Sequence, residues 1–296
     1  VYKRQAQSLE GLYTAVANRL ESGTGPYPVE RRVTEVKLQA LVGFAGDARA
    51  EELEAFLDGM PNRYFLANPV DVVRRHARIA RDRNGEFATV RVGPGPSEDV
   101  EELVVVTDDR PGLLSDLTTV LAAHDLSILS AEIYTRARPS GDEAFDVFLV
   151  RMGEETPGPE ALSRALARDL EERVHNRVSA ADLIARKTLR PSWSVRPGPK
   201  VPTHVSVDNE ASSKYTVVDV FTKDKPGLLH EVARTLYQLD LTIELSKVNT
   251  EGDRVADVFY VRDPDGNKLR DPMELKRLQQ TLEERVNALH ERDADS

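Results

Sequence analysis

The sequence predicts an α+β protein in which two tandem ferredoxin-like units, each with the order βαββαβ, follow a helical segment. Three observations lead to this prediction. One stretch of sequence occurs twice, the periodicity of apolar residues switches between strand and helix in the same order in both copies, and residues 6–82 have only helical periodicity.

The duplication is centred on one motif. TDDRPGLLSDL at residues 107–117 recurs as TKDKPGLLHEV at residues 222–232, and 11 of the 29 positions in 107–135 are identical at an offset of 115 residues. Further along, Asp-Val-Phe occurs at 146–148 and again at 257–259. Self-similarity of this kind indicates a repeated structural unit.

Within each copy, a short β-rich run turns through Asp-x-Pro-Gly-Leu-Leu into an amphipathic helix. The expected strands are 103–107, 127–135 and 145–151 in the first copy and 217–221, 242–250 and 255–261 in the second. The expected helical faces are 113–121, 162–174, 228–236 and 275–289. We expect a closing strand at 192–195 in the first copy, none after the second copy, and an extra strand at 203–207.

Before the repeats, one apolar stripe runs from Leu9 to Leu20 and another from Val33 to Val42. A third helix is expected from Ala50 to Gly59, and a fourth begins after Pro69. Gly-Pro-Gly-Pro-Ser at 93–97 predicts a turn. The expected organisation is a helical segment at 1–92, a first unit at 93–195, a linker with the extra strand at 196–214, and a second unit at 215–296.

Composition excludes several functions. The 296 residues contain no cysteine, which excludes disulfides and thiolate chemistry and fits a cytoplasmic protein. The formal charge of −10 is the wrong sign for coating nucleic acid or an anionic membrane, and no apolar run is long enough to span a bilayer. The chain has no methionine before Met60, so we expect a piece of a longer protein.

The two Asp-x-Pro-Gly-Leu loops have the chemistry of an anion site. Proline at the start of a helix gives up an N–H that has no intrahelical acceptor, and Gly112 or Gly227 allows a ligand to approach the backbone closely. The remaining N–H groups lie at the positive end of the helix dipole, which suits a small carboxylate such as that of an amino acid. A tight turn without a ligand is the alternative interpretation, and the second copy makes it the less favoured one.

Two other features have structural interpretations. His124-Asp125 resembles the metal-binding pair of phosphohydrolases, but the second copy has Leu239-Asp240 there, so we interpret both aspartates as shaping a helix-to-strand turn. We expect no metal site and no catalytic residue. Five arginines, Arg74, Arg75, Arg78, Arg81 and Arg83, mark a solvated or interdomain face of the fourth helix.

The repeated Asp-Arg-Pro-Gly-Leu-Leu and Asp-Lys-Pro-Gly-Leu-Leu resemble ACT domains, which bind amino acids and regulate the proteins that contain them. The resemblance covers about 102–189 and 215–290. The whole chain also resembles the C-terminal third of bifunctional protein-PII uridylyltransferase and uridylyl-removing enzymes. The supporting residues are LEGLYTAVANRLESG at 9–23, Arg63-Tyr64-Phe65 with Pro69 and His76-Ala77-Arg78, and Asp208 to Ser212 leading into Tyr215 to Asp219.

This resemblance implies a glutamine sensor for bacterial nitrogen regulation, in which the ACT pair switches the parent enzyme between adding uridylyl groups to the PII protein and removing them. Because both catalytic domains are missing, we expect this chain to bind without catalysing and to need no cofactor, whereas the parent nucleotidyltransferase would need Mg²⁺. We also expect ACT units to pair within or between chains. Transferred position by position, the implied ligand contacts are Asp109, Arg110, Pro111, Gly112, Leu113 and Leu114, the equivalent Asp224, Lys225, Pro226, Gly227, Leu228 and Leu229, and the facing strand starts Ile128 and Ile243.

Three alternatives stay open. The chain could be a stand-alone ACT-repeat binding protein, the regulatory tail of another enzyme such as a guanosine tetraphosphate synthetase, or a dimerisation module without a ligand. The amino acid itself is left undetermined, because backbone N–H groups recognise any carboxylate.

Overall fold

The structure is a computed structural model that describes residues 29–42, 48–153, 156–180, 182–183, 201–225, 227–248, 250–251 and 254–291. The stripe predicted between Leu9 and Leu20 and the closing strand predicted at 192–195 lie outside these residues. None of the helices in the described part of the chain is both long and apolar enough to cross a membrane.

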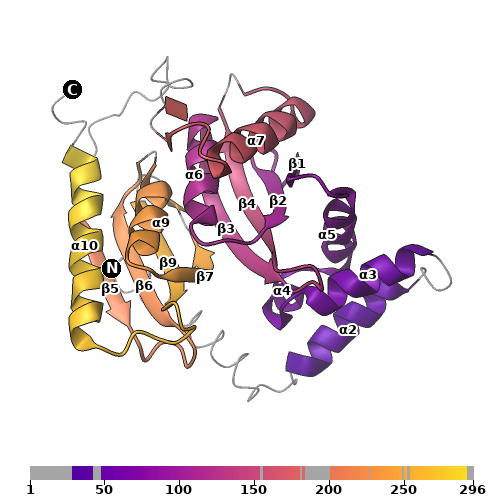
Figure 1. Cartoon of the computed structure of the whole chain (residues 1–296), viewed down its shortest axis with the longest axis horizontal. Coiled ribbons are helices and arrows are strands. Elements are labelled where there is room, and N and C mark those ends of the chain that lie inside the picture. Colours follow the sequence, from indigo (N-terminus) through magenta and orange to yellow (C-terminus); the bar gives the residue numbers. More distant parts are fainter. Residues whose placement is uncertain are drawn as a thin grey trace.

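Two antiparallel sheets with helices packed on them confirm the predicted α+β class (Figure 1). The first unit consists of β1 (Ala88–Pro94), β2 (Glu101–Asp108), α6 (Leu113–Ala123), β3 (Leu126–Arg136), β4 (Glu143–Met152) and α7 (Pro159–Val174). The second consists of β5 (His204–Asp208), β6 (Thr216–Lys223), α9 (Leu228–Gln238), β7 (Thr242–Lys247), β8 (Thr250–Glu251), β9 (Arg254–Arg262) and α10 (Pro272–Glu291). Their strand orders are β1-β2-β4-β3 and β5-β6-β9-β7, with β8 paired to β9.

In both sheets, a strand that precedes the repeated unit occupies one edge. β1 pairs with β2 from Ala88 opposite Thr107 to Pro94 opposite Glu101, and β5 pairs with β6 in the same way. This edge is the place that the closing strand of a βαββαβ unit would take. β5 confirms the strand predicted at 203–207. β1 was not predicted: it begins inside the expected helical segment and includes Gly93 and Pro94 of the expected turn, because seven residues find partners along β2.

In the described part of the chain, four helices precede the first sheet and cover one of its faces. They are α2 (Val29–Leu41), α3 (Ala48–Gly59), α4 (Asn62–Ala67) and α5 (Val70–Asp82). The predicted end at Gly59 and the start after Pro69 are confirmed, whereas the short α4 between them was not predicted. Figure 1 shows these helices together on one side of the first unit.

The first sheet is therefore buried on both faces. Phe56, Tyr64 and Phe65 of the helical segment pack with Val104, Val106, Tyr134, Phe145 and Val147 of the sheet. The opposite face packs against α6 and α7 in a core that extends into the second unit. Because both faces are covered, the run Leu-Val-Val-Val at 103–106 does not alternate between apolar and polar residues, and all four side chains are buried.

Asp125 and Asp240 do shape the helix-to-strand turns, as predicted. Both have left-handed backbone conformations, with φ of 57° and 59°, directly after α6 and α9. Aspartate tolerates this region better than most residues that have a side chain. His124 donates or accepts a 2.7 Å hydrogen bond with Asp169 of α7, so this side chain has a structural partner.

The predicted basic face of α5 is partly exposed and partly in contact with neighbouring elements: Arg78 and Arg81 are exposed, whereas Arg74 and Arg75 contact α2 and the sheet. Arg74 donates to the carbonyl oxygens of Gln39, Ala40 and Val42 at the end of α2. Arg75 pairs with Glu102 of β2 at 2.7 Å. The guanidinium group of Arg74 therefore binds the free carbonyl groups at the end of α2, and that of Arg75 binds the Glu102 carboxylate. Together they hold α5 between α2 and the sheet.

Candidate functional site

The two repeated loops connect a strand to a helix through a left-handed glycine. Gly112 and Gly227 are the N-cap residues of α6 and α9, with φ of 79° and 84° and ψ near zero. The N–H of Leu113 donates to Arg110 O at 3.2 Å, and that of Leu228 donates to Lys225 O at 3.1 Å. The glycines are required because an L residue is strained at this φ. The N–H groups of the first helical turn lack intrahelical acceptors, which gives each loop an anion-binding end.

We call residues 109–114 loop one and residues 224–229 loop two; Pro226 lies outside the described residues. Asp109, Asp224 and Pro111 are exposed, and Arg110, Lys225 and both glycines are half-buried. The four leucines predicted as ligand contacts are buried core residues of α6 and α9: Leu113, Leu114, Leu228 and Leu229. Within the described residues, the groups that the loops present to a ligand are therefore backbone N–H groups, aspartate carboxylates and basic side chains. Their leucines pack in the core and hold the helices there.

Loop one is held by several polar contacts. The N–H of Asp109 donates to Asp142 O at 3.0 Å, and its carboxylate accepts a 2.8 Å bond from Thr135 Oγ1. The next residue, Arg110, is ion-paired with the buried Asp116 of α6, which also pairs with Arg173 of α7. In loop two, Lys225 instead donates to a carbonyl at the end of α10, that of Leu289.

The two units pack side by side, with α6 against α9 and the edge strand β3 beside the edge strand β7. We call this boundary the seam. Thr119 Oγ1 and His230 Nδ1 are 2.8 Å apart across the helices, and Ser115 O lies 3.1 Å from the same nitrogen. Burial lowers the pKa of His230, so the imidazole is kept neutral. Pairing of ACT-like units within one chain is thus part of the structure.

Ile128 and Ile243, the predicted contacts at the strand starts, both lie at β-bulges. The register with the neighbouring strand shifts between Ile128 and Ser130 in the first unit and between Ile243 and Leu245 in the second. The two bulges are at equivalent positions of the repeat. Bulges commonly re-aim side chains next to binding sites.

Arg63 of α4 joins the helical segment to both units at the seam. Its Nη2 donates to Ile133 O of β3 at 2.7 Å and to Glu244 O of β7 at 2.6 Å. The guanidinium group also lies 4.9 Å from the centre of the Tyr134 ring, a cation–π contact. One side chain therefore contacts three parts of the molecule, and a change in the spacing of the two edge strands would alter its hydrogen bonds.

The loops differ in what covers them. A Cβ atom built on Gly112 would lie 3.2 Å from the ring of Tyr237 at the end of α9, whereas one on Gly227 would meet none of the described residues within 4 Å. The repeat offset places Ala122 of α6 at the position equivalent to Tyr237. The second unit thus places an aromatic ring on loop one, while loop two is open.

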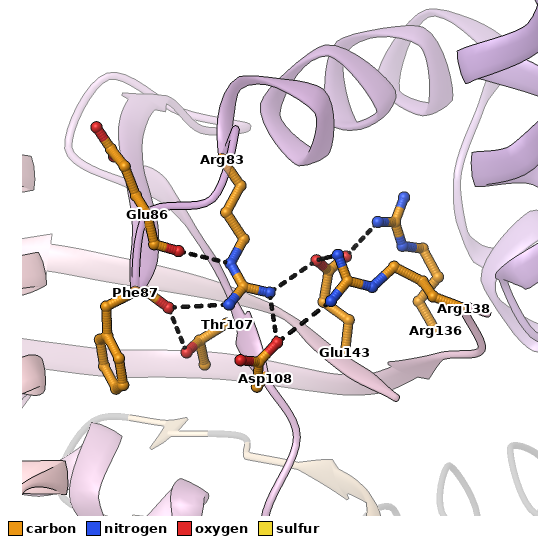
Figure 2. Close-up of polar contacts among 8 residues, drawn as sticks. All are labelled: Arg83, Glu86, Phe87, Thr107, Asp108, Arg136, Arg138 and Glu143. Carbon is orange, nitrogen blue, oxygen red and sulfur yellow. Dashed lines mark hydrogen bonds and ion pairs between the residues drawn. The ribbon is translucent and has the colours of Figure 1, made fainter. Parts of the chain in front are cut away.

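A network of buried charges supports the base of loop one (Figure 2). Arg83, at the end of α5, donates to Asp108 at 2.8 Å and to Glu143 at 3.0 Å. Arg136 and Arg138 also pair with Glu143, at 2.5 and 2.9 Å. Asp108 immediately precedes loop one, so the network links the helical segment to the strand that positions the loop.

A second polar chain connects the helical segment to the sheet through residues singled out by the resemblance. The Tyr64 hydroxyl and His76 Nδ1 are 2.9 Å apart, and His76 Nε2 lies 3.3 Å from Glu102 Oε1. Burial alone would raise the pKa of Glu102, but its hydrogen bonds with His76 and Arg75 outweigh burial and lower it. The tyrosine-histidine pair therefore has a packing role at this interface.

Comparison with known proteins agrees with this geometry. A family model described as ACT domain matches residues 102–165, and one described as ACR family N-terminal ACT domain matches residues 211–288. Both repeated units are therefore ACT domains, and the chain is a tandem ACT-domain protein with a preceding helical segment.

The chain as a whole is similar to bifunctional uridylyltransferase/uridylyl-removing enzymes, which confirms the resemblance seen in the sequence. The protein of that name from Gluconobacter oxydans (strain 621H) is 35% identical over 286 residues, which cover 94% of this chain and 29% of the relative. The one from Rhodospirillum rubrum is 34% identical over 284 residues, which cover 93% of this chain and 29% of the relative. This chain thus spans less than a third of the relatives' length.

Among solved structures, one described as "Crystal Structure of an Unknown Protein from Galdieria sulphuraria" is aligned over 69% of this chain and 94% of its own. Its identity to this chain is 15% and the TM-score is 0.20.

Proposed function

We propose that this chain is the glutamine-sensing regulatory region of an enzyme that adds uridylyl groups to the PII nitrogen-signalling protein and removes them. The observation that carries the proposal is the pair of ACT loops, each opening a helix through a left-handed glycine, with loop one lying against Tyr237 of the neighbouring unit. The names of the relatives support the link to uridylyl chemistry. In this proposal, the chain corresponds to the C-terminal portion of the parent enzyme and acts in the cytoplasm.

In the proposed mechanism, the ligand carboxylate meets the N–H groups of a loop, and its ammonium group and side chain contact the neighbouring ACT unit. A ligand shifts an equilibrium only through differential affinity for two states. Glutamine would therefore favour one spacing of the two ACT units, and Arg63, which donates to both edge strands, would communicate that spacing to the helical segment. The chain binds glutamine without a cofactor, and catalysis with Mg²⁺ belongs to domains of the parent enzyme.

Calorimetric titration of the 296-residue chain with glutamine, glutamate and leucine tests this proposal. Saturable binding selective for glutamine is expected. A folded sample that binds none of the three would contradict the sensor function and favour a role of the repeats in assembly alone.

Loop variants locate the site. Gly227→Asn adds a side chain to the open loop two, and asparagine tolerates a positive φ better than most residues, so the fold should survive. We expect at least about tenfold weaker glutamine binding, because the side chain would occupy space at the N–H groups. Gly266→Asn is the matched control, since Gly266 also has a φ of 78° and open surroundings but lies outside both loops. The loop assignment is wrong if Gly112→Asn and Gly227→Asn both keep wild-type affinity.

A further inference from the structure

Asp146 of β4 has a buried carboxyl group. In the sequence it is the first residue of the repeated Asp-Val-Phe. Its side chain is 1% exposed, and within the described residues its Oδ1 has no hydrogen-bond partner. Burial and the nearby carboxylate of Asp109 raise its pKa well above the ordinary value, while the Tyr134 N–H and Arg63 act in the opposite direction. An unpaired buried carboxylate is costly, so this position calls for a cationic partner.

Asp146 lies beside loop one and the seam. Side chains alternate along β4, so Asp146 is on the same face as Ala144 and Phe148, the face that packs against α6. Its neighbour across the strands is Ile133 of β3, whose carbonyl is held by Arg63 together with Glu244 O of the second unit. Two residues along β3 from Ile133, Thr135 donates to the carboxylate of Asp109 at 2.8 Å, which places the first residue of loop one near Asp146.

The unpaired groups in this neighbourhood have complementary charges. The N–H groups that open α6 are donors for an anion, Arg63 Nη1 is a buried donor without a hydrogen-bond partner in the described part of the chain, and Asp146 Oδ1 is a buried acceptor. An α-amino acid has its carboxylate and its ammonium on one carbon atom, so a single small ligand would satisfy both kinds of group.

We propose that Asp146 recognises the α-ammonium group of an amino acid bound at loop one, so that the first ACT unit selects zwitterions over simple carboxylic acids. This inference rests on the proposed amino-acid binding, and it identifies the residue that would bind the positively charged α-ammonium group of the ligand. Asp146 is 1% exposed, so binding requires that a segment over it moves, and the ring of Tyr237 lies against loop one at Gly112.

The test compares glutamine with glutaramate, which is glutamine without its α-ammonium group, by calorimetric titration of the wild-type chain and of Asp146→Asn. The wild type should prefer glutamine. The variant should bind glutamine about 10- to 100-fold more weakly, the range expected for a charged hydrogen bond, and should bind glutaramate as the wild type does. Asp219→Asn is the control, because Asp219 is a half-buried strand aspartate whose pKa is also raised by burial, but it is bonded to Ser206 in the second sheet.

Two results would overturn the assignment: an equal affinity of the wild type for both ligands, or an unchanged preference for glutamine in Asp146→Asn. Failure of the wild type to bind any amino acid would instead refute the proposed function, so the two failures are distinguishable. If Asp146→Asn does not fold, as judged by circular dichroism, Asp146→Ser replaces it.

Proton release provides an independent readout. Asp146 has a raised pKa when the site is empty and should ionise when an ammonium group arrives, with Asp109 and Arg63 as the charged groups that act on it. Titrations near neutral pH in buffers with different ionisation enthalpies should show protons released by the wild type and fewer by the variant. Equal release in both would refute the role of Asp146.

Discussion

Replacement of Glu143 by glutamine tests the buried network at the base of loop one most stringently. Glu143 is completely buried and is paired with Arg83, Arg136 and Arg138. The variant keeps the shape of the side chain but leaves Arg83 and Arg138 paired only with Asp108, whose side chain is 70% exposed. Arg136 then loses its one ion pair in the described part of the chain. Removing one partner of a buried ion pair typically costs 3–5 kcal/mol, so we expect the free energy of unfolding to fall by about 3 kcal/mol or more.

Asp108→Asn is the matched control for this prediction. Asp108 contacts Arg83 and Arg138, two of the same arginines, but from an exposed position where water and salt screen the charges. We expect a loss of less than about 1 kcal/mol. Urea denaturation followed by far-ultraviolet circular dichroism measures both changes. The reasoning fails if Glu143→Gln costs less than about 1 kcal/mol, or if the two variants are equally destabilised.

Three further predictions concern the interfaces of the first ACT unit. Tyr64→Phe should lower the free energy of unfolding by about 1–2 kcal/mol, because buried His76 loses its hydrogen bond; an unchanged urea midpoint would refute this. Acidification below pH 6.5 should destabilise the wild type more than His230→Gln, because burial lowers the pKa of His230 and unfolding favours the protonated form. Arg63→Ala should increase hydrogen exchange at both β3 and β7, and protection of either strand at the wild-type level would argue against the bridge.

Local features of this fold were predictable because the chemistry is local. The repeated Pro-Gly fixes a strand-turn-helix, which the left-handed Gly112 and Gly227 confirm, and the aspartates that end α6 and α9 have the backbone conformation expected of them. Strand β1 was not predicted because its Gly93 and Pro94 belong to a sequence typical of a turn, and only pairing with β2 selects an extended conformation.

The less predictable part of the candidate site depends on contacts between distant segments. Arg63 lies 70 residues before Ile133 and 181 before Glu244, so neither hydrogen bond has a sequence signal. Tyr237 is an exposed aromatic residue in the last turn of α9, and only its contact with Gly112 connects it to loop one. For Asp146, the repeated Asp-Val-Phe was a usable signal, since an aspartate inside an apolar strand calls for an explanation.

The central claim is that an amino acid binds at the ACT loops and the seam between the units. Hydrogen–deuterium exchange of the 296-residue chain with and without glutamine tests it most directly. We expect protection in 109–114 or 224–229, together with the bulged strand starts around Ile128 or Ile243 of the neighbouring unit. Exchange that is unchanged at both loops under glutamine concentrations that saturate binding would contradict this location.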